Sequence, residues 1–590
     1  MLPDNVPAET PEQPESTERR RVLGMFAGAL VTPFIRWSDL ISPSLEQPGP
    51  DDWARLGSEV HGRLLKPTSH MQPCIAAPGS PACAEALKHA GNPFFLEDHP
   101  GATQSTGWLG AWNSTPSSYC VAAETPQDVA AAVNFARKHG VQLVIKGTGH
   151  DYLGRSCAPD SLLVWTHKMR RVAFHERFVP VGAPASVKPV EALEVHAGAR
   201  WLEAYGEATT KHGRYVQGGG CCSVGACGGF VLGGGFGSFS KKHGTGAAGL
   251  LEVEIVTADG KIRIANKYRN ADLFWALRGG GGGTFGVVTR MTLLAHPLPS
   301  EFGLVKGKIT ASSEAAFRSL IERMLQFYEE DLNNEHWGEQ FEIGRDNSVS
   351  VYLTFQGLTK SQVEAKFAKL QNPGHWDAQF EVITIPARHM WDLEYLSKNH
   401  PDFITRDPRP GHEGEFWWTS NSGEVSKFWY TYQSRWVPES LCRPSKRKEF
   451  ASTLFHASRI WPVSFHINKG LAGASADAVR RTKETATNPN VFDAAALVIL
   501  SAGAQNAFTT VPGHTPDLAE ARAKAKQVGE AMKLIREATP NMGTYVNEAD
   551  YFEPNWQNQF WGTHYPKLLA VKRKYDPDNV FRTHHSVGSE

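Results

Sequence analysis

Apolar and polar positions follow a regular pattern from about residue 117 onward, and this pattern predicts both helices and strands. Apolar residues recur at helical spacing in 129–136, directly after a helix start at 125–128 that has a Thr N-cap, a first-turn Pro and an acid at N3. The short apolar run 141–145 is typical of a buried strand. Residues 250–257 alternate and then turn into 261–265, which predicts a β-hairpin.

Composition and charge exclude several classes of protein. The 590 residues exceed one ordinary domain. A hydrophobic content of 41% with 10% aromatic residues can fill a large core, which excludes global disorder. The 61 basic and 61 acidic residues give a net charge of zero, so a nucleic-acid partner is not expected. Apolar runs stay shorter than the roughly 18 residues of a membrane-spanning helix, and no membrane span is expected.

The N-terminal segment differs in composition from the rest of the chain. Residues 1–17 are polar and rich in Pro and Glu, which predicts disorder. The arginines at 19–21 precede the short apolar stretch 25–35, a pattern similar to a twin-arginine export signal, with an amphipathic helix as the alternative. Cys74 and Cys83 suit a loop-closing disulfide of an oxidising compartment. We therefore expect an exported protein, periplasmic or secreted, with a cytoplasmic location as the alternative.

Two glycine-rich segments interrupt the regular pattern. The strand at 141–145 leads into Lys146-Gly147-Thr148-Gly149-His150-Asp151, and such a turn presents backbone N–H groups to a phosphate. Residues 218–237 are dense in glycine with Val, Leu and Phe interleaved, which does not fit a flexible linker. This density is explained if the backbone must lie against a flat or anionic ligand. Zinc is a poor alternative, because the adjacent cysteines at 221 and 222 are unfavourable joint ligands.

The glycine-rich segments belong to a larger set that resembles a known flavoprotein family. Residues 146–156, 218–237, 272–289 and 545–581 look like the FAD-binding motifs of the vanillyl-alcohol-oxidase superfamily, most similar to its berberine-bridge-enzyme-like branch. The resemblance implies an α+β fold. It consists of a two-subdomain FAD-binding unit of the PCMH type and a substrate domain with an antiparallel sheet covered by helices.

The resemblance also implies a division of the chain into five segments. Residues 1–46 would be the export signal and disordered leader, and 47–112 an N-terminal extension. The FAD-binding domain would span 113–298 and the substrate-binding domain 299–542. Residues 543–590 would return to the FAD-binding domain.

The cofactor implied by the resemblance is FAD, attached covalently through His150 at the flavin 8α-methyl group. A second bond to flavin C6 would come from Cys221 or Cys222; one extra residue in the loop leaves both open, and spacing to Val224 slightly favours Cys221. No metal is expected. The residues expected to contact the cofactor are Lys146, Gly147, Thr148, Gly149, His150, Asp151, Ser156, Gly220, Cys221, Cys222, Val224, Gly225, Gly228, Gly229, Gly234, Phe236, Gly237, Val287, Tyr545 and Asn547.

The catalytic base does not follow from the resemblance. Plant members carry tyrosines where this chain has Phe236 and Glu548. The apparent strand 428–436 offers Tyr430 and Tyr432, which alternation places on one face unless a bulge intervenes.

Two further side chains complete the expected catalytic set. Arg435 follows on the opposite face of the same strand, and His466 lies on a second apparent strand at 463–469. A tyrosine is therefore expected as the base, with Arg435 or His466 as electrostatic support.

The function implied by the resemblance is that of a flavin oxidase. Hydride would pass from a substrate carbon, in a carbohydrate or an alcohol, to flavin N5, and dioxygen would then be reduced to hydrogen peroxide. Val224, the small residue three positions after Cys221, favours access of dioxygen in the family. A dehydrogenase with another acceptor is the first alternative, and a non-catalytic secreted binding protein on the same fold is the second.

Overall fold

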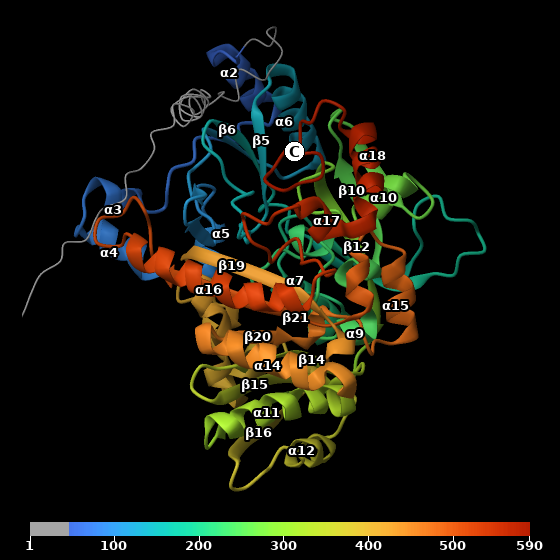
Figure 1. The fold of residues 1–590 in the computed structure, drawn as a ribbon. Helices are drawn as coiled ribbons and strands as arrows, with labels where there is room; N and C mark the ends of the chain where they lie inside the picture. Colours follow the sequence, from blue (N-terminus) through green and yellow to red (C-terminus); the bar gives the residue numbers. More distant parts are fainter. Residues whose placement is uncertain (1–46) are drawn as a thin grey trace, which may run out of the picture. The chain divides into compact units, whose positions relative to one another are not determined.

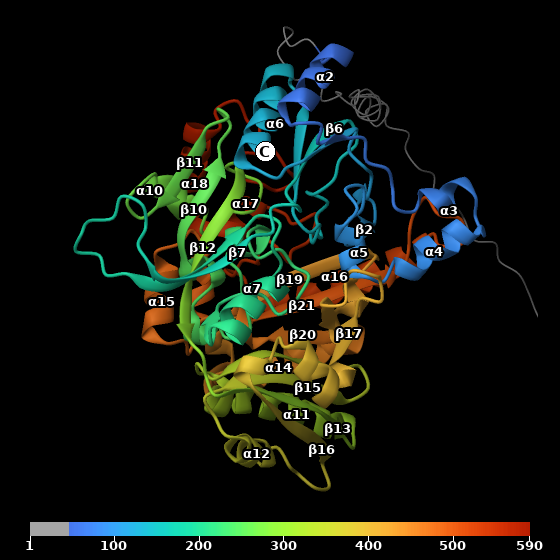
Figure 2. The same ribbon diagram turned by 180° about the vertical axis from the view of Figure 1, so that it is seen from behind.

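Three large sheets organise the part of the chain that the structure describes. The structure is a computed structural model; it describes residues 47–590, of which 48–590 form one compact unit. The expected export signal at 1–46 lies outside the described residues. Figures 1 and 2 show the arrangement from opposite sides. Among residues 47–590, no helix is long and apolar enough to cross a membrane.

The first sheet has four strands and a parallel core. Its order is β1 (Leu64–Leu65), β4 (Tyr119–Ala122), β6 (Ser161–Trp165) and β5 (Gln142–Lys146), with only β1 antiparallel. Helix α6 (Pro126–His139) packs its apolar face on this sheet, next to α2 (Pro50–Glu59). The predicted helix start is confirmed: Thr125 Oγ1 accepts from Asp128 N at 3.2 Å, and the Asp128 carboxylate accepts from Thr125 N at 2.9 Å.

The second sheet has six antiparallel strands. Its path is β11 (Ile262–Asn266), β10 (Leu250–Val256), β12 (Val287–Pro297), β8 (Val190–His196) and β7 (Val172–Phe178), with β9 (Arg214–Val216) also on β12. The predicted hairpin is confirmed, because β10 and β11 pair antiparallel. The short helices around this sheet are α7 (Trp201–Tyr205), α8 (Gly229–Leu232), α9 (Ser240–His243) and α10 (Ala271–Ala276).

The third sheet has nine strands and one face covered by helices. Its order is β16 (Trp376–Pro386), β13 (Glu301–Ala311), β15 (Ser348–Gln356), β14 (Trp337–Ile343), β20 (Val463–His466), β21 (Ala494–Gln505), β19 (Lys427–Pro438), β2 (Ser105–Trp108) and β3 (Trp112–Asn113). Helices α11 (Glu314–Phe327), α14 (Pro444–Ile460) and α16 (Leu518–Ala538) bury their apolar residues on that face (Figure 1). The opposite face is directed toward the first two sheets. The expected α+β class is confirmed.

Both end regions of the described chain contact elements that are distant in sequence. Strands β2 and β3 extend the third sheet, since β2 runs parallel to β19. Upstream, α3 (Gln72–Ala76) and α4 (Pro81–His89) are linked by the expected disulfide Cys74–Cys83, and α5 (Pro93–Glu97) follows. At the other end, α17 (Trp556–Trp561) and α18 (Tyr565–Tyr575) return to α10 (Figure 1), where Trp561 Nε1 donates to Gly279 O at 2.9 Å.

Lys146, at the end of β5, fixes the N-terminal extension to the first sheet. Its Nζ donates to the carbonyls of His99, Pro100 and Ala102 at 2.9, 2.8 and 2.8 Å. The ammonium group of Lys146 is thus engaged by the N-terminal extension, while the residue also lines the cavity described below. Burial lowers the pKa of Lys146 to about 8.

Replacement of Lys146 by Met is expected to weaken the fold in a pH-dependent way. At neutral pH the free energy of unfolding should fall by about 1.5–3 kcal/mol, because a charged donor is lost from buried carbonyls. The pKa in the folded state lies below the unfolded value of about 10.4. Deprotonation is therefore easier in the folded protein, and wild-type stability should rise, relative to Lys146→Met, between pH 8 and pH 10. Urea unfolding across this range measures both effects.

Lys168 provides the matched control, since it is exposed just beyond β6. Lys168→Met should leave the free energy of unfolding within about 0.5 kcal/mol of wild type. Equal losses in the two variants would contradict the role assigned to Lys146.

Candidate active site

A cavity of about 870 Å³ lies between the open face of the third sheet and the glycine-rich loops of the first two. Lining residues come from the segments 146–152, 219–230, 418–424 and 466–469, and Asn547 and Glu548 line the cavity as well. Six strands of the third sheet, β13, β14, β15, β16, β19 and β20, contribute residues to the lining. The cavity has the size of a ligand site and combines apolar walls with a few polar groups.

The turn after β5 offers unpaired backbone donors to this cavity. The N–H groups of Thr148, Gly149 and His150 have no acceptor within residues 47–590. Gly149 has a φ of 83°, a conformation that glycine adopts without steric cost and that brings successive N–H groups to one side. The turn therefore fits the phosphate-binding role that the sequence predicts.

The second glycine-rich loop leaves open space beside its backbone. A Cβ added at Gly220, Gly228 or Gly229 would meet no atom within 4 Å, and all three residues line the cavity. Gly225 N donates to Thr148 Oγ1 at 3.1 Å and joins this loop to the first. A flat cofactor can approach both loops closely.

Most of the expected cofactor contacts line the cavity, and some lie behind its wall. Those that line it are Lys146, Gly147, Thr148, Gly149, His150, Asp151, Ser156, Gly220, Cys221, Val224, Gly225, Gly228, Gly229, Phe236 and Asn547. Cys222, Gly234, Gly237, Val287 and Tyr545 are not part of the lining. Packing explains this, since a Cβ at Gly237 would lie 2.0 Å from Gly218 O and the Tyr545 hydroxyl accepts from Asn547 Nδ2 at 2.9 Å.

His150 and Cys221 share one neighbour at the cavity wall. His150 Nε2 is hydrogen-bonded to Ser223 Oγ at 2.9 Å, and Cys221 Sγ lies 3.4 Å from the same oxygen. Burial lowers the pKa of His150 to about 4 and raises that of the Cys221 thiol to about 11. Cys222 instead packs away from the cavity against Phe94 and Leu202. Of the two cysteines left open by the sequence, only Cys221 lines the cavity.

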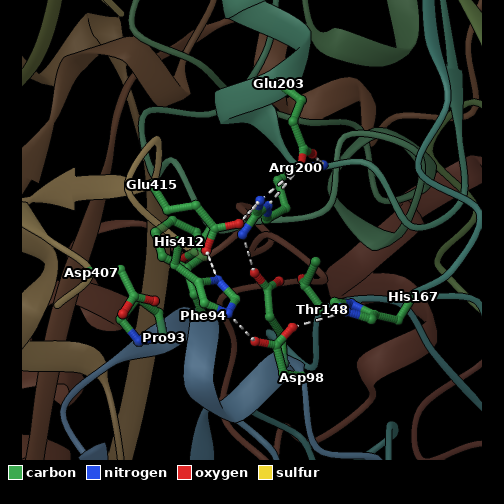
Figure 3. A network of polar contacts seen from close by, with 12 residues as sticks. Pro93, Phe94, Asp98, Thr148, His167, Arg200, Glu203, Asp407, His412 and Glu415 are labelled. Atoms are coloured by element: carbon green, nitrogen blue, oxygen red, sulfur yellow. Dashed lines mark hydrogen bonds and ion pairs between the residues drawn. The ribbon is translucent and has the colours of Figure 1, made fainter. Parts of the chain in front are cut away.

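The Cys221 loop is fixed from behind by a backbone pairing that begins at Arg200. Trp201 N donates to Val224 O at 2.9 Å, and Leu202 N donates to Cys222 O at 3.0 Å. The Arg200 guanidinium is 3% exposed and binds Glu97 at 2.8 Å and Glu415 at 2.5 Å. Figure 3 shows this guanidinium between carboxylates from different parts of the chain. The buried cation therefore ties α5, through Glu97, and the segment around Glu415 to the loop that carries Cys221.

Part of the same network has the composition of a metal site but is occupied by arginines. Ligand atoms of Asp407, His412 and Glu415 lie within 4.8 Å of one another. Arg409 binds both carboxylate oxygens of Asp407. Arg200 binds Glu415, as Figure 3 shows. These ion pairs satisfy the carboxylates that a cation would require.

A β-bulge separates the two tyrosines expected to share a face. The pairing of β19 with β21 shifts between Trp429 and Thr431, so the extra residue reverses the alternation. Tyr430 points to α16, with its hydroxyl 3.4 Å from Glu520, whereas Tyr432 lines the cavity. The bulge that the sequence left open is therefore present, and the two tyrosines lie on opposite faces.

Arg435 lies outside the cavity, and His466 lies inside it. Arg435 Nη1 donates to Gln559 Oε1 at 2.7 Å and Arg435 Nε to Thr539 Oγ1 at 3.1 Å, which joins α16 to the C-terminal segment. His466 lines the cavity, but burial holds its pKa well below the usual value. It is therefore a neutral imidazole, without the positive charge expected for electrostatic support.

Two pairs of polar side chains at the cavity were missed from the sequence. The Tyr152 hydroxyl donates to Glu424 Oε2 at 3.0 Å. Lys469 Nζ binds the Glu548 carboxylate at 2.5 and 2.7 Å. The proximity of Tyr152 to His150 in the sequence was a usable signal. Glu424 carries none, because only the fold brings it to the cavity.

The two carboxylates differ in their electrostatic surroundings. Glu548 has a direct cationic partner in Lys469. The Glu424 side chain is accessible from the open cavity, yet desolvation by the surrounding walls raises its pKa. Tyr152 and Tyr432 stack at 4.9 Å, and burial raises both phenol pKa values well above the usual range. The site therefore holds neutral phenols beside a carboxylate with increased proton affinity.

Comparison with known proteins agrees with this geometry. The family model of an FAD binding domain matches residues 117–266, and that of berberine and berberine-like proteins matches residues 544–588. An uncharacterised FAD-linked oxidoreductase of Arthroderma benhamiae is 30% identical over 564 residues, which cover 91% of this chain and 92% of that protein. The VAO-type flavoprotein oxidase VAO615 of Thermothelomyces thermophilus is 30% identical over 569 residues, with 92% and 91% covered.

Solved structures share the fold over nearly the whole chain. The VAO-type flavoprotein MtVAO615 from Myceliophthora thermophila C1 has a TM-score of 0.74 at 26% identity and covers 93% of this chain and 97% of its own. A carbohydrate oxidase from Microdochium nivale has a TM-score of 0.62 at 19% identity, covering 88% and 100%, and is similar in fold alone. The family resemblance seen in the sequence is confirmed. The chain belongs to the FAD-linked oxidoreductases of the vanillyl-alcohol-oxidase superfamily, in its berberine-bridge-enzyme-like branch.

Proposed function

We propose that the protein is a flavin oxidase whose proton acceptor is the Tyr152–Glu424 pair. The observation that carries the proposal is a single cavity in which this pair and the cofactor loops face the same space. FAD, when bound, supplies the redox chemistry: it takes hydride from a substrate carbon at N5 and passes the electrons to dioxygen, which gives hydrogen peroxide. The substrate carbon is that of an alcohol or a carbohydrate.

The loops fit FAD, and we propose a covalent attachment through His150 with a second bond from Cys221. His150 Nε2 is hydrogen-bonded to Ser223, so Nδ1 would form the bond to the 8α-methyl group. Cys221 is favoured over Cys222 because it lines the cavity. The three free N–H groups of the turn would hold the pyrophosphate.

His150→Ala, Cys221→Ser and Cys222→Ser test the two attachments. Wild-type protein should keep its yellow colour after acid precipitation, and a peptide map should find flavin on His150 and Cys221. Each of the first two substitutions should remove one attachment and leave the other. Cys222→Ser is the matched control and should retain both. Doubly linked flavin in Cys221→Ser would overturn the assignment of the cysteine.

Proton transfer is assigned to Tyr152 and Glu424 because of their hydrogen bond and their charge states. The Tyr152 oxygen can accept the substrate hydroxyl proton while its own proton moves to Glu424 Oε2. The raised pKa of Glu424 increases its strength as a base. Tyr432 packs on Tyr152 and limits its orientation. Glu548 is less suited, because Lys469 already stabilises its charge.

Tyr152→Phe and Glu424→Gln should slow flavin reduction by about a hundred- to ten-thousand-fold, the usual contribution of a general base. Stopped-flow absorbance measures reduction separately from reoxidation, which should stay normal. In wild type, reduction should fall as the pH drops through the raised pKa of Glu424, since the protonated carboxyl cannot accept a proton. Glu424→Gln should lack this acidic limb.

Tyr430→Phe is the control for these variants, because Tyr430 lies on the helix-covered face of the sheet. It should reduce its flavin at the wild-type rate. The assignment fails if neither Tyr152→Phe nor Glu424→Gln slows reduction by even tenfold.

Dioxygen is proposed as the electron acceptor because Val224 is a small residue of the cavity wall beside Cys221. A dehydrogenase with another acceptor stays the alternative. The non-catalytic binding protein is disfavoured, because the chain belongs to a family of oxidoreductases.

We further propose that the protein is exported by a twin-arginine signal within residues 1–46. The Cys74–Cys83 disulfide supports an oxidising compartment. Replacement of both Arg19 and Arg20 by Lys should leave the protein in the cytoplasm, as fractionation and immunoblotting would show. Undiminished export of this variant, or cytoplasmic wild-type protein, would refute the twin-arginine assignment.

A further inference from the structure

One strand residue of the cavity wall has a backbone conformation that strands normally exclude. Glu339 in β14 has a φ of 67°, and of the described non-glycine residues with positive φ it alone lies inside a named strand. Left-handed backbone is unfavourable for a residue with a Cβ, and such positions concentrate at functional sites.

The contact between two domains explains how this conformation is maintained. Gly338 packs so tightly on the FAD-binding domain that an added Cβ would lie 1.9 Å from Ser238 O. The Ser238 hydroxyl donates to Glu339 Oε1. The close approach and the hydrogen bond together fix the Glu339 side chain at the cavity, which it lines.

Glu339 has no cationic partner in the described chain. None of the ion pairs formed by residues 47–590 includes Glu339 or Glu424. Lys427 and Lys469 act on Glu424 from a distance and Lys469 acts on Glu339, but Lys469 binds Glu548 directly. Glu339 and Glu424 therefore face the cavity without an ion pair, and a half-buried carboxylate such as that of Glu339, without a direct counter-charge, favours a cationic ligand.

A second acceptor and the aromatic walls point to the same kind of ligand. Asn468 lines the cavity, is 2% exposed and has an Oδ1 atom that no protein donor reaches. Tyr152 and Tyr432 present a stacked pair of rings, and Trp418 lines the cavity as well. Aromatic faces attract cations and pack against flat rings.

We propose that Glu339 is a specificity-determining residue that binds a positively charged nitrogen of the substrate, so that the enzyme prefers aromatic alcohols that also bear a protonated amine. This inference rests on the proposed function, because it takes the cavity as the substrate site. Glu339 acts by binding and orienting the substrate, while proton transfer stays with Tyr152 and Glu424. Uncharged sugars would lack the group that Glu339 recognises.

Binding of two matched probes to the flavin-loaded, full-length protein tests the proposal. Tryptamine and tryptophol share the indole ring and differ in an ammonium against a hydroxyl group. Dissociation constants are read from perturbation of the flavin absorbance under anaerobic conditions. Wild-type protein should bind tryptamine at least about tenfold more tightly, the effect of one charge-assisted hydrogen bond.

Two substitutions should abolish this preference by different routes. Glu339→Gln keeps the shape of the side chain and removes its charge. Glu339→Gly removes the carboxylate and also relieves the left-handed backbone, so folding is not impaired. Both variants should bind tryptamine about tenfold more weakly than wild type and tryptophol with less than about a threefold change. Glu342→Gln, on the same strand but outside the cavity, should behave as wild type.

Three outcomes of the binding experiment would overturn the inference. It fails if wild type does not prefer tryptamine, if neither probe perturbs the flavin, or if the Glu339 variants weaken both probes equally. The measurement needs no turnover. Failure of this inference is therefore distinguishable from failure of the proposed oxidase function, which flavin reduction in the Tyr152 variant tests separately.

Discussion

The structure depends on keeping a row of backbone donors unpaired inside a folded protein. Each buried N–H group without an acceptor costs about 1–3 kcal/mol, so the turn at 148–150 must be held by other contacts or satisfied by a ligand. Lys146 holds the start of the turn, Gly225 binds Thr148, and Ser223 binds His150. The buried Arg200 then fixes the segment that pairs with the second loop. These contacts keep the turn open without using its donors.

Whether a feature of the fold or of the site could be predicted depends on how far apart in the sequence its interacting residues lie. The cap of α6, the hairpin β10–β11 and the glycine-rich turn depend on neighbours in sequence, and each was predicted correctly. Tyr430 was misplaced because the bulge in β19 arises from pairing with β21, about 70 residues away. The Lys146 ammonium binds carbonyls that lie before residue 103, a contact that no local pattern indicates. Glu424 was missed for the same reason.

The charge states in the cavity come from burial more than from the residue types themselves. Desolvation holds the pKa of His466 well below its usual value, so its imidazole stays neutral, and it raises the phenol pKa values of Tyr152 and Tyr432 well above their usual range. The same desolvation raises the proton affinity of the Glu424 carboxyl. One physical effect thus removes His466 as a cation and strengthens Glu424 as a base. These differences in pKa arise only when the chain folds and the groups lose contact with water.

The two sides of the cavity present different kinds of chemical group, backbone donors on the loop side and side chains on the sheet side. The loops at 147–150 and 218–229 act through backbone N–H groups and open glycine positions, so they need a defined conformation and tolerate few residue types. The substrate side of the cavity consists of side chains projecting from strands, which can change without altering the ladder. Glu339 is an exception. The direction of its carboxylate depends on its own left-handed backbone and on the hydrogen bond from Ser238 of the FAD-binding domain. Substrate preference can therefore change by substitution along the sheet, whereas the direction of that carboxylate is set by the contact between the domains.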